Sequence, residues 1–261
     1  GVKLIVFFRG WNVNNQWLFE TFLLKKLTKI LLLADRYLVL NTTVEKYLIA
    51  KKVNPSNISR ATTVIPDSYS MSDIYIEQSI SKEKIRLLFL GRVVVEKGLY
   101  ELVSSMKKLH GKATLTIVGD GDAWNDLYDE IRQDNKLNAM INIKHSITGR
   151  DKLSCYLEHD VFILPSYSEG MPNSILEAMA LGLVVVGSSV GALPSLISKY
   201  GGLIVRPKSD KSIVSAINKI TDDKQYYYSE SSKKRNIVKN NFSAYCVRDY
   251  LLHEYNILLR M

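Results

Sequence analysis

Cysteine is scarce in this sequence, and that scarcity excludes two classes of small structural domain. The 261 residues contain only Cys155 and Cys246, which lie far apart along the chain. Such a pair provides neither a disulfide framework nor the ligand spacing of a zinc site. Two unpaired thiols suit a reducing compartment, so we expect a cytoplasmic protein.

Three further absences narrow the class of partner. The longest apolar stretches all contain Lys, Arg or Asp, which excludes a membrane-spanning helix, and no secretory signal is present. Lys and Arg number 35 against 26 Asp and Glu, a formal charge of +9, yet no compact basic block, RNP-like aromatic pattern or zinc-finger spacing occurs. We therefore expect no nucleic-acid partner. The basic excess favours phosphate-bearing ligands or an anionic membrane surface, which leaves peripheral contact with the inner face of the cell membrane as an open alternative.

The sequence also lacks an initiating Met. It opens almost directly on the apolar run "VKLIVFF" (2–8). A natural terminus seldom begins inside a core strand, so we expect that an N-terminal region has been truncated.

Beyond Ile85 a regular alternation of short apolar runs and amphipathic stretches is present. The apolar runs, which predict strands, are 85–91, 113–119, 140–145, 161–165, 183–188 and 202–205. The predicted helices between and after them are 98–109, 123–134, 151–158, 173–181, 192–199 and 210–221. Strands alternating with helices predict an α/β fold with a Rossmann-like, doubly wound parallel sheet.

The segment before Ile85 predicts a partial α/β domain. Its expected elements are strands at 2–8 and 36–41, an apolar helix at 17–34, a helix at 42–52 and a strand running into a turn at 61–68. Pro66 and the polar stretch to Glu83 are typical of a linker. We therefore divide the chain into 1–66, a remnant of a first domain, 67–245, a complete second domain, and 246–261, a C-terminal helix that packs back toward the first domain.

Polar residues gather where the predicted strands end, which is where open α/β sheets bind ligands. The most informative stretch is "EGMPNS" (169–174). Pro172 suits the first turn of a helix, and Gly170 lets the backbone approach a ligand closely. The free N–H groups and dipole of that helix end favour an anion such as phosphate.

Two glutamates flank this turn, Glu169 at the mouth of the helix and Glu177 two turns inside it. Alone, such acids are most often solvated residues of an exposed face. Here they accompany a phosphate-ready turn and the cations Arg92 and Lys97 at another strand end. We therefore interpret them as hydroxyl acceptors, Glu177 for a ribose and Glu169 for a second polyol across the phosphates.

Several motifs together resemble family 4 retaining glycosyltransferases of the GT-B fold. "SYSEGMPNSILEAMALG" (166–182) is similar to that family's E-x7-E motif, and "FLGRVVVEKG" (89–98) to its G-R-x4-K-G donor-diphosphate motif. "TIVGDGD", "HDVFILPS" and "LADRYLVLN…VIPDS" resemble its other signatures. The resemblance covers about residues 34–205 in register. It implies a GT-B architecture in which residues 1–66 belong to the acceptor-side domain.

The resemblance also implies roles for individual residues. Arg92 and Lys97 would neutralise the donor diphosphate in place of a metal, and Glu169 would contact the donor sugar; these three form the implied catalytic set. The implied donor-binding set is Gly91, His145, Ser146, Ile147, Gly170, Met171, Pro172, Asn173, Ser174 and Glu177. Within this set Glu177 would hold the ribose hydroxyls and the loop 145–147 would face the nucleobase. No cofactor or metal site is implied.

The chain departs from the family pattern at several positions. His145 stands where the family usually has Gly, Ser195 stands at an acid position, and the N-terminal glycine-rich loop is absent. Arg9 stands where the family often has a basic residue near the reacting sugar, so it is the candidate on the acceptor side.

We accordingly expect transfer of a hexose, with retention, from a nucleotide-diphosphate sugar to a hydroxyl of a saccharide or lipid-linked acceptor, in polysaccharide or glycolipid synthesis. Two alternatives stay open: a non-catalytic nucleotide-sugar-binding subunit that needs a partner chain, and a GT-B nucleotide-sugar epimerase. The stretch "DGD" (120–122) imitates a D-x-D metal motif, but its glycine-rich position after a strand favours a structural turn.

Overall fold

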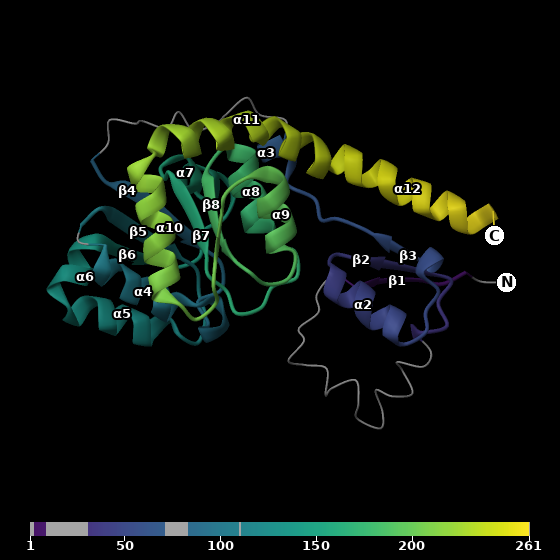
Figure 1. The fold of residues 1–261 in the computed structure, drawn as a ribbon, viewed down its shortest axis with the longest axis horizontal. Coiled ribbons are helices and arrows are strands. Elements are labelled where there is room, and N and C mark those ends of the chain that lie inside the picture. Colours follow the sequence, from purple (N-terminus) through teal and green to yellow (C-terminus); the bar gives the residue numbers. More distant parts are fainter. Residues whose placement is uncertain (1–2, 9–30, 71–82, 110, 261) are drawn as a thin grey trace, which may run out of the picture.

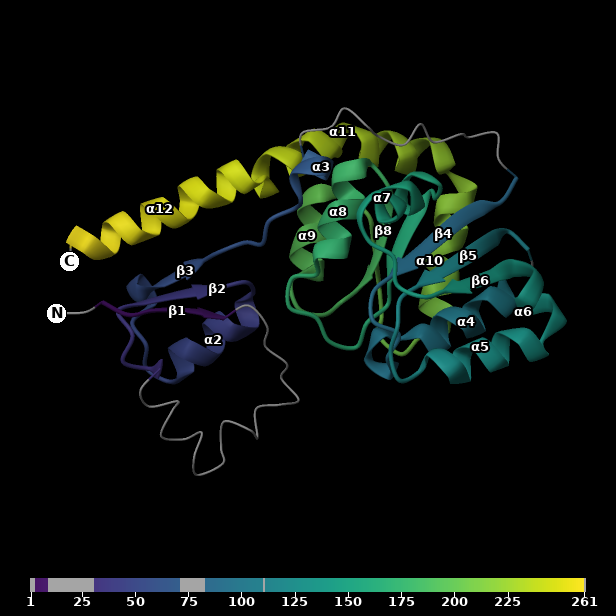
Figure 2. The same ribbon diagram turned by 180° about the vertical axis from the view of Figure 1, so that it is seen from behind.

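The chain folds around two separate parallel sheets. A computed structural model describes residues 3–8, 31–70, 83–109 and 111–260 (Figure 1). One sheet has three strands in the order β1-β2-β3, and the other has six in the order β6-β5-β4-β7-β8-β9. The two sheets lie side by side, and a long C-terminal helix extends from the larger toward the smaller (Figure 2).

The six-stranded sheet is doubly wound. Its strands are β4 (Ile85–Leu90), β5 (Ala113–Val118), β6 (Ile141–Lys144), β7 (Val161–Leu164), β8 (Val184–Ser188) and β9 (Leu203–Val205). Chain order reverses between the neighbours β4 and β7, and every pairing is parallel. This reversal is the topological switch point at which such sheets bind ligands. The predicted Rossmann-like sheet is confirmed, with all six strands where the apolar runs placed them.

Helices cover both faces of this sheet. They are α4 (Leu99–Lys108), α5 (Trp124–Gln133), α6 (Asn135–Met140), α7 (Gly149–Leu157), α8 (Asn173–Leu181), α9 (Leu193–Tyr200), α10 (Asp210–Asp222) and α11 (Lys224–Phe242). Helix α10 packs against α4, whereas α11 packs against α8 and α9. Burial from both sides explains the apolar sequences of the central strands, since every residue of β7 and β8 is buried.

The three-stranded sheet is smaller and less deeply buried. It contains β1 (Ile5–Phe8), β2 (Arg36–Val39) and β3 (Ile58–Arg60), with α2 (Thr42–Ala50) and the 3-10 turn η2 (Pro55–Asn57) between the last two strands. Asn41 caps α2 by accepting a hydrogen bond from the Val44 amide. The central strand β2 is fully buried, whereas β1 is half exposed.

The passage between the sheets differs from the expected strand at 61–68. The strand is β3 at 58–60, residues 61–66 are irregular, and the short helix α3 (Asp67–Ser70) follows. Ile65 is fully buried in the core of the larger sheet, and its amide donates to the Phe242 carbonyl. The prediction of a strand over 61–68 is wrong. The Ala61 amide still donates to Val39 O of β2, but after it the chain leaves that sheet, and the Ile65 amide bonds to α11.

The last helix, α12 (Ala244–Arg260), joins the two parts of the molecule. It follows α11 after a break at Ser243 and packs against the smaller sheet (Figure 1). Arg36 of β2 and Glu254 of α12 form an ion pair of 2.8 Å in which both side chains are buried. The proposed domain limits at 66 and 245 stay predictions.

Two predictions concern residues outside the described ranges. Arg9 is one, and most of the expected helix at 17–34 is the other. In the ranges that are described, no helix combines the length and apolar character needed to cross a bilayer.

Candidate functional site

The predicted site residues follow neighbouring strands of the larger sheet. Gly91 and Arg92 follow β4, His145 follows β6 and Glu169 lies beyond β7. The order β6-β5-β4-β7 is contiguous, so these strand ends form a single edge. We call this edge the carboxyl rim: residues 91–98, 119–123, 145–147, 165–174 and 189–192.

Lys97 and Glu169 form an ion pair at the centre of the carboxyl rim. Lys97 Nζ lies 2.5 Å from Glu169 Oε1, and the Ser166 hydroxyl donates to the same oxygen at 2.7 Å. The side chains are only 16% and 8% exposed, respectively. The two residues are 72 positions apart in sequence, so the fold brings together a cation and an acid that sequence analysis assigned to different parts of a ligand.

Backbone contacts fix this pair in place. Lys97 ends the 3-10 turn η3 (Val95–Lys97), and Gly98 follows with φ of 68°. A Cβ at Gly98 would lie 2.2 Å from the Pro165 carbonyl oxygen, so only glycine fits. The Tyr167 amide donates to Glu96 O at 2.7 Å. The loops after β4 and β7 are therefore packed backbone to backbone.

The N-terminus of α8 opens onto the carboxyl rim. The helix begins at Asn173, as predicted, but Pro172 is its N-cap rather than part of its first turn, and no side chain caps it. The first-turn N–H groups therefore keep their hydrogen-bonding capacity for an anion. Gly170 O accepts a hydrogen bond from the Ala192 amide at 2.9 Å, which ties the 169–174 turn to the loop after β8.

Glu177 is more enclosed than its predicted role suggests. It is 3% exposed, and Lys152 Nζ lies 2.9 and 2.7 Å from its two carboxylate oxygens. The Tyr156 hydroxyl donates to Oε2 at 2.8 Å, and burial together with Glu177 raises the pKa of that phenol. Protein donors therefore already engage both oxygens of this buried carboxylate, and the ribose role stays a prediction.

Arg92 contrasts with these enclosed residues. Its side chain is exposed, and it makes no ion pair with the rest of the described chain. The neighbouring Gly91 amide donates to Val118 O at 3.1 Å, which ties the loop to β5. Arg92 is thus a cation available to a ligand, in the same segment after β4 as the paired cation Lys97.

The loop after β6 is held by the "DGD" turn. Asp120 accepts from His145 Nδ1 at 2.6 Å and from the Ser146 amide at 3.1 Å. The side chain of Ile147 instead packs against the core. Both oxygens of Asp120 are therefore engaged by protein donors. Among the described residues, no three His, Cys, Asp or Glu side chains are grouped as metal ligands would be.

Other predicted residues lie where the two sheets meet. Met171 packs against both cores, and the Thr62 hydroxyl lies 3.5 Å from its sulfur. Thr63 Oγ1 lies 2.8 Å from Asn173 Oδ1, and Ser174 O accepts from the Tyr156 hydroxyl at 3.3 Å. The contacts of Met171 and Asn173 couple the 169–174 turn to the passage between the sheets, whereas that of Ser174 joins α8 to α7.

Four residues of this site were not predicted from the sequence: Asp120 as a side-chain acceptor, Lys152, Tyr156 and Ser166. Asp120 and Ser166 carried a local signal, because each directly follows a predicted strand. Lys152 and Tyr156 reach Glu177 from α7, and no local pattern reports a contact between two helices.

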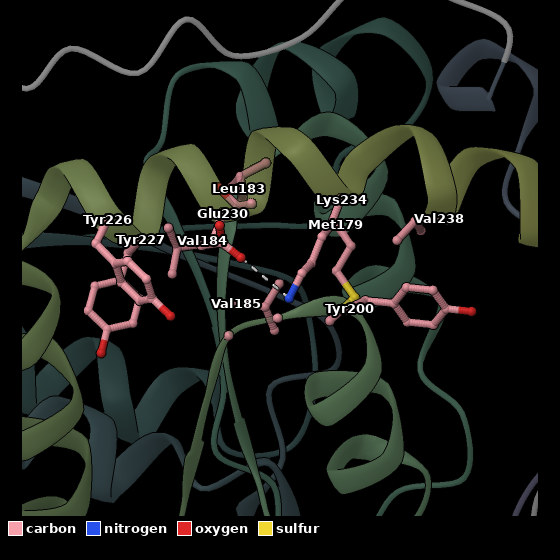
Figure 3. Close-up of a pocket in the computed structure, with 13 residues that line it drawn as sticks. Met179, Leu183, Val184, Val185, Tyr200, Tyr226, Tyr227, Glu230, Lys234 and Val238 are labelled. Atoms are coloured by element: carbon pink, nitrogen blue, oxygen red, sulfur yellow. Dashed lines mark ion pairs between the residues drawn. The ribbon is translucent and has the colours of Figure 1, made fainter.

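A small cavity lies at the opposite end of the sheet (Figure 3). It encloses about 70 Å³ between α11 and the starts of β8 and β9. Glu230 and Lys234 of α11 point into it and pair at 3.6 Å, with Val185 below them and Tyr226 and Tyr227 to one side. We call this end, with the residues that precede the strands, the amino rim.

Comparison with known proteins identifies relatives of this chain. The sequence model of the family described as "Glycosyl transferases group 1" matches residues 70–242. The chain is 31% identical over 180 residues to the putative teichuronic acid biosynthesis glycosyltransferase TuaC of Bacillus subtilis, covering 66% of this chain and 42% of that protein. It is 30% identical over 178 residues to the capsular polysaccharide biosynthesis glycosyltransferase CapM of Staphylococcus aureus, covering 66% of this chain and 46% of that protein.

Solved structures agree on the fold. The structure of Anabaena Alr3699/HepE in complex with UDP superposes with a TM-score of 0.79 at 16% identity, over 97% of this chain and 72% of that one. Sucrose-phosphate synthase from Thermosynechococcus elongatus gives 0.75 at 22% identity, over 91% of this chain and 61% of that one. The GT-B fold expected from the resemblance is confirmed. The chain spans less than half the length of the curated relatives TuaC and CapM.

Proposed function

The chain belongs to the glycosyl transferases group 1 family, and from this premise we propose that it moves a hexose from a nucleotide-diphosphate sugar to an acceptor hydroxyl with retention. The acceptor is a saccharide or a lipid-linked saccharide in polysaccharide or glycolipid synthesis. The similarity to TuaC, a putative teichuronic acid biosynthesis glycosyltransferase, and to CapM, a capsular polysaccharide biosynthesis glycosyltransferase, supports this choice.

The observation that carries the proposal is the arrangement of charge beside α8. A free cation, Arg92, a paired cation, Lys97, and an uncapped helix N-terminus lie on one rim. All three attract the anionic oxygens of a diphosphate, and Glu169 adds an acceptor for sugar hydroxyls. In this proposal the ligand's oxygens take over part of the hydrogen bonding that Lys97 now gives to Glu169.

The chemistry follows from where charge develops. The bond from the anomeric carbon to the diphosphate oxygen breaks, and negative charge gathers on the leaving diphosphate. The acceptor oxygen bonds to the same face of the anomeric carbon, and its proton passes to the leaving diphosphate. Arg92, Lys97 and the α8 N–H groups stabilise that charge, which is the largest kind of contribution in such sites.

Metal independence is part of the proposal. The cations and the helix N-terminus take the place of a divalent ion, and both oxygens of Asp120 are engaged by His145 and Ser146. Turnover should therefore persist in EDTA. Loss of turnover on chelation, with recovery on adding Mg²⁺ or Mn²⁺, would contradict this part of the proposal.

A thermal-shift panel of nucleotides and nucleotide sugars tests the donor. A ligand that binds only the folded state at 100-fold excess over its dissociation constant adds about 2.7 kcal/mol to stability. A nucleoside diphosphate and its sugar conjugate should raise the midpoint. Binding without transfer to any acceptor would favour the non-catalytic subunit, and a sugar altered at one carbon but still attached to its nucleotide would favour the epimerase.

Contact with an anionic membrane stays a separate proposal. It rests on the basic, apolar sequence at 17–34, most of which lies outside the described residues. Binding to anionic vesicles should weaken with salt. Equal sedimentation with neutral vesicles, or none with either kind, would remove the idea.

A further inference from the structure

We propose that His145 is a stacking platform for the nucleobase of the donor and that Asp120 is the residue that positions it. The proposal rests on the proposed function, because it assigns a residue to one part of the same ligand. It goes beyond the family resemblance, which implied only that the loop 145–147 faces the base and which has glycine where this chain has His145.

A column of aromatic rings ends at His145. The Tyr128 and Trp124 rings of α5 stack with centroids 5.0 Å apart and planes 13° apart. The Trp124 and His145 rings stack at 4.2 Å and 10°. Three nearly parallel rings therefore run from α5 onto the loop after β6. Because its side chain is 71% exposed, His145 leaves the end of the column open to solvent.

Asp120 fixes the orientation of this last ring. One carboxylate oxygen accepts from His145 Nδ1 at 2.6 Å, and the other accepts from the Ser146 amide at 3.1 Å. Hydrogen bonds from Ser146 and His145 hold the pKa of the Asp120 carboxyl below its usual value, which keeps the carboxylate ionised. Asp120, the first Asp of the "DGD" turn, thus binds both the His145 ring and the backbone of the loop 145–147.

The same turn is locked against the diphosphate loop. A Cβ on Gly119 would lie 1.8 Å from Gly91 O, and a Cβ on Gly121 would lie 2.3 Å from Val93 O. The Val93 amide donates to Asp120 O at 2.9 Å. The turn that holds His145 is therefore packed directly on the loop that carries Arg92.

The spacing of the strands suits a nucleotide. His145 follows β6 and Arg92 follows β4, with only β5 between them. Two strand spacings place these ends about 10 Å apart, on the order of the reach from a base to its diphosphate. A base on the open face of His145 would extend the ring column by one member while its diphosphate approaches Arg92 and Lys97.

The exposure of His145 argues against a purely structural purpose. An aromatic side chain that packs in the core is normally buried, whereas an exposed one contributes little to the free energy of unfolding. Its outer face is available for stacking, which is tolerant of base identity because every base has a π-face. The platform therefore separates nucleotides from simple diphosphates rather than one base from another.

Calorimetry on the full chain with two probes tests the platform. UDP carries a base, whereas inorganic pyrophosphate does not. His145→Ala should weaken UDP binding about 10-fold, within the range for loss of one stacked base, and leave pyrophosphate binding unchanged. His145→Phe keeps a ring but loses the hydrogen bond to Asp120, so its UDP affinity should fall between those of the wild type and His145→Ala. His253→Ala, which removes an exposed histidine from α12, should change neither.

A double-mutant cycle tests the positioning role. Asp120→Asn should lower the ratio of UDP to pyrophosphate affinity, and adding it to His145→Ala should produce little further loss, because both changes remove the same platform. Thermal denaturation checks that each variant is folded. Wild-type protein that binds neither probe would contradict the proposed function. UDP binding that survives His145→Ala in a folded protein would overturn the platform alone.

Discussion

The two rims of the six-stranded sheet both carry Lys–Glu pairs, yet the pairs differ in setting. At the carboxyl rim, Lys97 and Glu169 are 16% and 8% exposed and come from loops 72 residues apart. At the amino rim, Lys234 and Glu230 are 33% and 31% exposed and lie one turn apart on α11 (Figure 3). The Lys97–Glu169 pair depends on the tertiary structure, whereas Glu230 and Lys234 form an ordinary i,i+4 pair on the surface of one helix.

Close backbone-to-backbone packing at glycines is more frequent at the carboxyl rim. Carboxyl-rim glycines at 98, 119, 121 and 191 all abut backbone atoms of another loop. At the amino rim Gly202 abuts Val185 O in the same way, whereas a Cβ at Gly111, before β5, would meet nothing within 4 Å. The carboxyl rim is therefore a set of loops fixed against one another around enclosed charges. Such fixed charges suit ligand binding because little rearrangement is needed when the ligand arrives. The amino rim is where we expect changes to alter stability alone.

The largest effect is expected from Asp160 at the amino rim. This carboxylate is 1% exposed and accepts from Arg86 Nη2 at 2.6 Å and Nε at 3.0 Å. Asp160→Ala should lower the free energy of unfolding by about 3 kcal/mol, at the low end for breaking a buried pair because Arg86 is 28% exposed and can be rehydrated. Denaturant titration measures it, with exposed Glu158→Ala as control. Nucleotide affinity of the folded variant should not change. A change would contradict the expectation that the amino rim affects stability alone.

At the carboxyl rim the expected loss is in binding. Lys97→Ala should weaken nucleoside-diphosphate binding by about 1.5–3 kcal/mol, the value of a hydrogen bond to a charged group. Isothermal titration calorimetry measures the loss. Lys234→Ala removes the matching cation of the amino rim and should leave binding as it is. If the two variants bind equally well, the diphosphate assignment fails.

A pair of glycine substitutions tests the backbone difference. Gly111 and Gly191 both have positive φ, 79° and 56°, so alanine costs about 1–2 kcal/mol at either from backbone conformation alone. A Cβ at Gly191 would also lie 2.0 Å from Glu169 O, whereas none of the surroundings obstructs one at Gly111. Gly191→Ala should therefore destabilise more and also weaken nucleotide binding. Equal unfolding midpoints with unchanged affinity would show that the rim loops are not held as described.

The smallest effect is expected at the exposed pair of the amino rim. Glu230 pairs with Lys234 at 3.6 Å and with Lys233 at 3.2 Å, and water screens both contacts. Glu230→Gln should leave the thermal midpoint and nucleotide affinity within measurement error. A clear drop in the thermal midpoint or in nucleotide affinity would mean that Glu230 and the cavity of Figure 3 contribute to stability or to binding.

The sequence by itself determined the strands and helices of the larger sheet and which residues follow its strands at the carboxyl rim. The central strands are short apolar runs because both faces of the sheet are buried there, and a turn follows each of them. The alternation with helices required parallel strands, and parallel strands place all their carboxyl ends on one edge. Gly91, Arg92, His145 and Glu169 could therefore be placed on that edge before any coordinates.

Only the tertiary structure decided which of these groups touch. Local pattern suggested a strand at 61–68, but Ile65 instead donates to Phe242 O, a partner 177 residues away that no local pattern reports. The same holds for Lys97 with Glu169, for Glu177 with Lys152 and Tyr156, and for His145 with Trp124. Periodicity records whether a residue faces the core or water, whereas a hydrogen bond or a ring stack depends on where another loop or helix comes to rest.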